Sequence, residues 1–163
     1  VSRANAVQAE ETARLEGEGS AEVLERLHKV PGCEDLSWDD VQIASTIFAV
    51  KPGDGSAREQ AASCQRVLGA GANIVTEYAT KRYRSNLINW GMLPLQLAGA
   101  TPFGLGDYVF IPNVREALKG DLKDIKAYVL GETVREFDLY MAPLTDDERK
   151  ILADGCLINF YKH

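Results

Sequence analysis

The sequence is poor in the residues that build metal sites and disulfides. Only three cysteines and two histidines occur among 163 residues. The cysteines Cys33, Cys64 and Cys156 lie far apart, and no Cys-x-x-Cys pair is present. Because a structural metal site needs about four thiolate or imidazole ligands at suitable spacing, this chain is not expected to build one by itself. No disulfide framework is expected either, and each cysteine is interpreted as a reduced core residue.

Long apolar runs and positive charge are also scarce. No apolar stretch approaches the ~20 residues that cross a bilayer, and the first residues lack the apolar core of a signal peptide. We therefore expect a cytoplasmic protein without a membrane segment. The formal net charge of -6 disfavours nucleic-acid binding, which needs a basic surface. The basic cluster Lys81, Arg82 and Arg84 beside Tyr83 is accordingly interpreted as a solvated helix turn.

The overall composition is that of one compact domain. The chain is 45% hydrophobic and 26% charged, which is ordinary for a folded domain of this length. A chain of this size can bury one sizeable core but hardly two, and no internal repeat or linker interrupts it. Residues 1–163 are therefore predicted to form a single domain. Since the chain starts at Val1 and has no initiator methionine, we expect it to be the C-terminal fragment of a larger protein.

Hydrophobic patterns predict alternating helices and strands. Helices are predicted for two segments between residues 5 and 29, the second from Ser20, and for residues 57–68, 81–90 and 114–118. Strands are predicted for residues 43–50, 72–76 and 92–97, with a hairpin at 125–130 and 134–139. The first of these strands should be buried, and a last helix should open at Thr145 and run through Leu157. The pattern predicts an α/β domain with helices packed on a mostly buried sheet.

The most informative segment is the glycine loop Gly53-Asp-Gly-Ser-Ala-Arg-Glu-Gln60. It follows a predicted strand and opens a helix near Ser56. Glycines let a ligand approach the backbone, and the first N–H groups of a helix have no helical acceptor, so they form an anion site together with the helix dipole. Arg58 opposes that dipole in the first turn, but its forked guanidinium suits a carboxylate. The loop therefore predicts a carboxylate-binding site.

A structural alternative exists for the same residues. Ser56-Ala-Arg-Glu59 also has the spacing of a capping box, in which a serine and a glutamate satisfy each other's backbone N–H groups. The two interpretations are compatible for Glu59 and compete only for the serine hydroxyl. Spacing alone leaves both of them open.

Three blocks of sequence resemble the aconitase superfamily. The stretch Gly53-Asp-Gly-Ser-Ala-Arg-Glu-Gln-Ala-Ala resembles the signature Gly-x-Gly-Ser-Ser-Arg-Glu-His-Ala. Arg66-Val-Leu-Gly and Asn73-Ile-Val-Thr resemble the helix end and strand that follow the signature. Asn86-Leu and Gly91-Met-Leu-Pro-Leu are similar to the family's Asn-Leu-x-x-x-Gly-Leu-Leu-Pro-Leu. The order of the blocks makes the resemblance specific, and the end of the chain resembles the tail of divergent bacterial aconitase-like hydratases.

This resemblance implies a fold and a chemistry. The fold would be a swivelling β/β/α domain that closes over a four-iron four-sulfur cluster held by other domains, since this chain has no cluster ligands of its own. The full enzyme would be a hydro-lyase acting reversibly on a small hydroxy di- or tricarboxylate, and this domain alone would be inactive. Ser56 would be the catalytic base, while Gly55, Ala57 and Arg58 would bind the substrate.

Several departures from the family pattern leave alternatives open. The second serine of the signature is Ala57 here, its histidine is Gln60, and a usual arginine is Lys81. The family's Asp-x-x-Thr-Asp strand and loop are not visible. We therefore expect a divergent hydratase with a substrate other than citrate, or a degenerate enzyme. The alternatives are a separate small subunit that pairs with a large subunit, as in isopropylmalate isomerase, and a non-catalytic regulatory or RNA-binding relative.

Overall fold

The computed structural model describes residues 20–162. The helices are α2 (Ser20–His28), the 3-10 helix η1 (Trp38–Asp40), α3 (Arg58–Val67), α4 (Lys81–Asn89), α5 (Val114–Lys119), α6 (Asp146–Asp154) and α7 (Leu157–Phe160). The strands are β1 (Ser45–Ala49), β2 (Ala70–Val75), β3 (Leu93–Gln96), β4 (Val109–Phe110), β5 (Ile125–Leu130) and β6 (Val134–Leu139). The helix predicted before Ser20 lies outside the described residues. No helix within residues 20–162 is long and apolar enough to span a bilayer.

The strands form two three-stranded sheets that meet at one point. Strands β1, β2 and β3 are parallel neighbours in that order, and β4, β5 and β6 are antiparallel neighbours. Gln96 at the end of β3 and Tyr140 just after β6 form an isolated antiparallel bridge, with N···O distances of 2.7 and 3.0 Å. The predicted sheet is therefore observed as two joined parts: a parallel sheet of β1 to β3 and an antiparallel sheet of β4 to β6.

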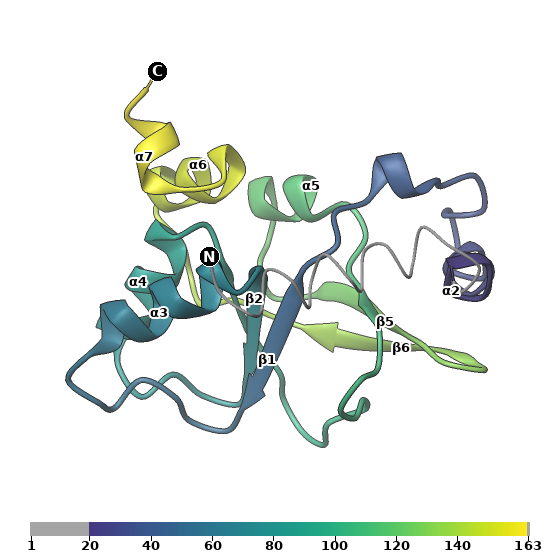
Figure 1. Ribbon diagram of the computed structural model, residues 1–163, viewed down its shortest axis with the longest axis horizontal. Coiled ribbons are helices and arrows are strands. Elements are labelled where there is room, and N and C mark those ends of the chain that lie inside the picture. The colour runs from purple at the N-terminus through teal and green to yellow at the C-terminus, as the bar shows by residue number, and fades with distance from the viewer. Residues whose placement is uncertain (1–19, 163) are drawn as a thin grey trace.

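The two faces of the parallel sheet are covered by different layers, most fully at β2 and β3. Helices α3 and α4 lie on one side of β1 and β2, and strands β5 and β6 lie on the other (Figure 1). On the helix side, Tyr83 and Leu87 pack with Ala62. On the other side, Ile74 and Leu95 join a core that includes residues of β5 and β6. The parallel crossover through α3 therefore brings the loop after β1 to the margin of the helical layer.

The prediction that the first strand is buried is wrong. Strand β1 is present, but Ile47 and Phe48 are each 40% exposed, and Val50 beyond its end is 66% exposed. The reason is topological, because β1 is an edge strand that pairs only with β2. A β-branched apolar run predicts a strand but does not show how many of its faces are covered. Phe48 is partly shielded by an edge-to-face contact with Phe103, at a centroid distance of 5.8 Å.

The prediction of one final helix is also wrong, because the helix breaks at Gly155. This residue has φ 91 and ends α6 in the left-handed conformation. A side chain at the facing Gly91, where φ is 72, would put its Cβ 1.6 Å from the carbonyl oxygen of Gly155. The turns after α4 and α6 are therefore packed backbone to backbone. The hairpin of β5 and β6 is confirmed with its predicted bounds.

Candidate active site at the start of α3

The loop after β1 leads into an uncapped helix. Helix α3 begins at Arg58, and its N-cap is Ala57, with φ -89, ψ 50 and no side-chain capping bond. The first turn of the helix closes with the N–H of Ala61 donating to the oxygen of Ala57 at 3.0 Å. The N–H groups of residues 58–60 have no helical acceptor, so they face the loop together with the positive end of the helix dipole. This geometry is suited to binding an anion.

The capping-box alternative for Ser56 and Glu59 is wrong. The helix starts one residue too late for Ser56 to be its N-cap. Ser56 is exposed, and its hydroxyl forms no hydrogen bond with any residue of the described range 20–162. The hydroxyl is therefore available to a ligand at the start of α3.

Arg58 carries a buried donor without a partner. Its side chain is only partly buried, but its Nε atom is buried and makes no hydrogen bond within the described part of the chain. An unpaired buried donor on a charged group costs a few kcal/mol, on the order of its desolvation penalty. A carboxylate bound at the start of α3 is a chemical partner that would satisfy such a guanidinium.

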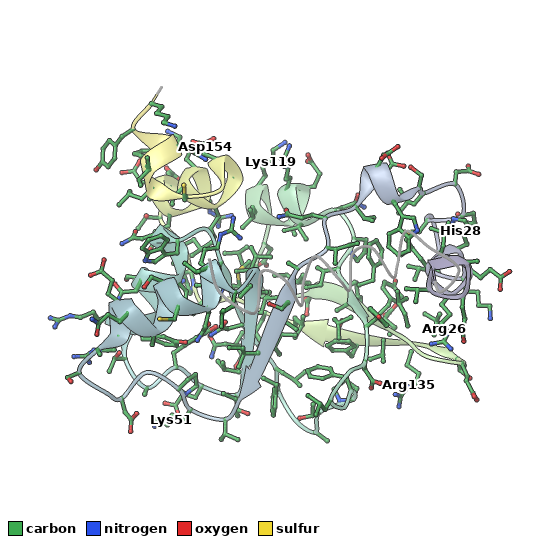
Figure 2. The ribbon with its side chains drawn as sticks, in the orientation of Figure 1. Arg26, His28, Lys51, Lys119, Arg135 and Asp154 are labelled. Carbon is green, nitrogen blue, oxygen red and sulfur yellow. The ribbon has the colours of Figure 1, made fainter. Side chains whose placement is uncertain are left out.

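The predicted site residues lie on consecutive, accessible positions. Gly55, Ser56 and Ala57 are exposed, and Arg58 follows them. No atom lies within 4 Å of the position that a Cβ would take at Gly55. Figure 2 shows Lys51 at the outer rim of the same loop, where its Nζ lies 3.0 Å from a carboxylate oxygen of Glu77. The loop is thus open to solvent, and a substrate bound there would need a further surface to exclude water.

Two residues that support this loop were missed by the sequence interpretation. Thr80 and Tyr83, at the start of α4, both contact Gly53. Tyr83 is 2% exposed and belongs to the core, although charged residues flank it on α4. The spacing of Tyr83 and Leu87, four residues apart on one helix face, was the available signal for a buried face.

The solvated surface predicted for Lys81, Arg82 and Arg84 is wrong for Arg84. Its Nη2 donates to the carbonyl oxygens of Ala142 and Pro143 at 2.8 and 3.0 Å. Arg84 therefore ties α4 to the segment that precedes α6, whereas Lys81 and Arg82 are exposed as expected.

The Tyr78 phenol lies between β2 and α4 in the chain. Burial raises the pKa of the Tyr78 phenol far above its usual value, with a smaller rise from Tyr83 and an opposing effect of Arg84. Tyr78 therefore stays protonated and donates to the oxygen of Leu95 at 3.2 Å.

No group of three or more His, Cys, Asp or Glu side chains within residues 20–162 is placed to hold a metal ion.

The cysteines differ from one another in their surroundings. Cys33 is buried, as expected of a core residue, and all three thiols are free. Cys64 on α3 is exposed, and Cys156 is intermediate. The interpretation of every cysteine as a core residue is therefore wrong for Cys64.

Taken together, these features define an α/β domain with an uncapped helix start at its surface, where the geometry suits an anion. Comparisons with known proteins place it in a family. A family model described as "Aconitase C-terminal domain" matches residues 29–100. An aconitate hydratase A of Rickettsia felis is 32% identical over 134 residues, which is 77% of this chain and 15% of the relative. That of Mycobacterium avium is 34% identical over 116 residues, 66% of this chain and 12% of the relative.

A solved structure agrees with these relatives. The 3-isopropylmalate dehydratase of Methanocaldococcus jannaschii has a TM-score of 0.56 and 30% identity, and the match covers 76% of this chain and 66% of that one. The chain belongs to the aconitase superfamily and has the α/β fold of its C-terminal swivel domain, as predicted. It spans only 15% of the length of the Rickettsia felis relative.

Proposed function

We propose that this chain is the C-terminal, substrate-closing domain of a hydro-lyase that reversibly hydrates and dehydrates a small hydroxy di- or tricarboxylate. Ser56 is assigned as the catalytic base, and Gly55, Ala57 and Arg58 as substrate-binding residues. The observation that carries this assignment is the free hydroxyl of Ser56 beside an uncapped helix start. A residue needed only for folding would be expected to use that hydroxyl in the capping box.

The step assigned to this chain is the transfer of a proton to or from a substrate carbon. Dehydration removes a proton from one substrate carbon and hydroxide from its neighbour, and hydration reverses both steps. A serine hydroxyl is a poor base in water, so it needs a site that stabilises its alkoxide. The free N–H groups and the dipole at the start of α3 supply that stabilisation. Arg58 would hold a substrate carboxylate and so orient the carbon that exchanges its proton with Ser56.

The remaining parts of the active site belong to other domains or to a large subunit. Family membership implies a four-iron four-sulfur cluster, but the residues from 20 to 162 offer no ligand set for it. We therefore assign no step of the reaction in this chain to a cluster, and we expect the domain alone to be inactive. The location in the cytoplasm stays a prediction.

The substrate class follows from the relatives and from two departures. The related proteins are named for aconitate and for 3-isopropylmalate, which are both small carboxylates. Ala57 and Gln60 replace a serine and a histidine of the family signature, so a hydroxyl contact is lost and only the backbone N–H of Ala57 remains. This favours a substrate other than citrate.

A Ser56→Ala substitution in the complete enzyme tests the proposal. We expect kcat to fall by about 10²–10⁴-fold, the usual contribution of a general base. The assay is the ultraviolet absorbance of the conjugated double bond of aconitate or of the dehydration product of 3-isopropylmalate. Ser63→Ala is the matched control, because Ser63 lies on the same helix and donates only to the oxygen of Gln60 at 3.1 Å. Unchanged turnover of the Ser56 variant would reject the base role and favour a non-catalytic relative.

A further inference from the structure

The first turn of α4 holds the loop that carries Ser56. The Oγ1 atom of Thr80 accepts a hydrogen bond from the N–H of Tyr83 at 3.2 Å and thereby caps α4. The same hydroxyl donates to the carbonyl oxygen of Gly53 at 3.0 Å. Since a hydroxyl has a single hydrogen, its donor is used entirely on Gly53. One side chain therefore fixes both the start of α4 and the direction of a loop carbonyl.

The ring of Tyr83 limits where the backbone of Gly53 can lie. Gly53 has φ 96, and a Cβ at this position would come within 2.5 Å of the Cβ and Cγ atoms of Tyr83. Only glycine fits this close approach, because other residues would clash and would rarely adopt that φ. Backbone bonds from Glu77 N to Val50 O and from Ala79 N to Pro52 O, each 3.0 Å, align the preceding part of the loop. The loop is thus held from Val50 to Gly53.

The hydroxyl of Tyr83 is itself anchored on two other elements. It accepts hydrogen bonds from Nε2 of Gln65 on α3 at 2.8 Å and from Nδ2 of Asn73 on β2 at 3.0 Å. Asn73 is 1% exposed, so this contact is buried. Tyr83 therefore contacts the loop before Ser56 and the helix after it, with β2 as the common support.

We propose that Thr80 and Tyr83 are positioning residues for Ser56, acting through Gly53 and α3; this inference rests on the proposed role of Ser56. An exposed glycine loop does not hold a base in one place by itself. Displacement of a reacting group by about 1 Å can lower the rate roughly 10²-fold. The contacts of Thr80 and Tyr83 remove that freedom without touching the substrate.

The test compares Thr80→Val with Thr80→Ser in the complete enzyme. Valine has a similar shape but no hydroxyl, whereas serine keeps both hydrogen bonds. We expect Thr80→Val to lower kcat by about 10- to 100-fold with a much smaller change in KM, and Thr80→Ser to stay within about twofold of the wild type. Tyr83→Phe keeps the ring against Gly53 but loses the two amide contacts, so we expect a smaller fall in kcat. It also serves as the second probe if the valine variant does not fold.

Two controls separate positioning from general stability and from the proposed function. Val23→Ala lies in a different core cluster and should lower the melting temperature without lowering kcat. In a Ser56→Ala background, Thr80→Val should lower the residual kcat no further, because both changes act on one step. Wild-type kcat in both Thr80→Val and Tyr83→Phe, or full multiplication of the losses in the double variant, would overturn the inference. If Ser56→Ala loses activity while the Thr80 and Tyr83 variants keep it, the positioning inference fails and the proposed function stands. If Ser56→Ala keeps wild-type activity, both the proposed base role of Ser56 and the positioning inference fail.

Discussion

Near the start of two helices in residues 20–162, a serine or threonine is followed three residues later by a glutamate. At α6, Thr145 accepts from the N–H of Glu148 at 3.2 Å, and the Glu148 carboxylate accepts from the N–H of Thr145 at 2.9 Å. At α3, Ser56 is displaced from the N-cap position and no side-chain cap forms. The first turn of α6 carries three acids, Asp146, Asp147 and Glu148, whereas that of α3 carries Arg58 beside the single acid Glu59. The start of α6 is capped by its own side chains, and the start of α3 has no side-chain cap.

The difference shows what each helix start contributes. The closed box at α6 stabilises the fold and leaves little positive potential, because Asp146 and Asp147 add negative charge beside the dipole. The open start of α3 gives up that stabilisation and keeps its N–H groups and the hydroxyl of Ser56 accessible. Functional sites commonly break a local rule of this kind. Changes at α3 should therefore affect activity, and equivalent changes at α6 should affect stability.

The largest effect expected beyond Ser56 and Thr80 is at Arg58. In the complete enzyme, Arg58→Gln should raise KM by about 10- to 100-fold, since a hydrogen bond to a charged group contributes about 1.5–3 kcal/mol. Arg58→Lys keeps the charge but not the forked geometry, so we expect an intermediate rise. Steady-state kinetics measure both. Arg82→Gln is the matched control, because Arg82 is an exposed cation on α4. An unchanged KM in Arg58→Gln would show that the open helix start does not hold a carboxylate.

At α6 we expect a smaller effect, on the free energy of unfolding and not on activity. Thr145→Ala should lower the free energy of unfolding by about 1 kcal/mol, the usual effect of losing an N-cap. Activity should not change, because among residues 20–162 the Thr145 hydroxyl bonds only to the N–H of Glu148. Ser56→Ala should shift the free energy of unfolding by less than about 0.5 kcal/mol. Chemical denaturation of both variants measures the contrast. Equal destabilisation by the two substitutions would mean that α3 is capped in solution in the same way as α6.

Much of the fold could be predicted from local patterns, but the state of the site could not. The hairpin of β5 and β6 follows from the spacing of two strand segments around Gly131-Glu132, and the sequence predicts the helix start at Thr145. The exposure of β1 depends on strand order, which no local pattern records. The spacing of Tyr83 and Leu87 signals a buried helix face, but the partners of the Tyr83 hydroxyl, Gln65 and Asn73, lie 18 and 10 residues away in the chain and follow only from the fold.

The site illustrates the same limit more sharply. Ser56 and Thr145 carry equivalent capping signals, so spacing alone could not tell which hydroxyl is free. The loop before α3 is held at Gly53 by Thr80 and Tyr83, which lie 27 and 30 residues further along the chain. Helix α3 then begins at Arg58, with Ala57 as its N-cap, so Ser56 lies one residue before the cap.

The smallest predicted effect isolates the single bond that distinguishes the two helix starts. Glu59→Ala and Glu148→Ala each remove an acid from the first turn, so each should lose a similar dipole interaction of about 0.3–1 kcal/mol. Only Glu148 also accepts a hydrogen bond from the backbone, at Thr145. We therefore expect Glu148→Ala to be more destabilising by roughly 0.5–1 kcal/mol, near the net value of one hydrogen bond. Parallel urea titrations resolve that difference, and a destabilisation as large in Glu59→Ala would place a second closed box at α3.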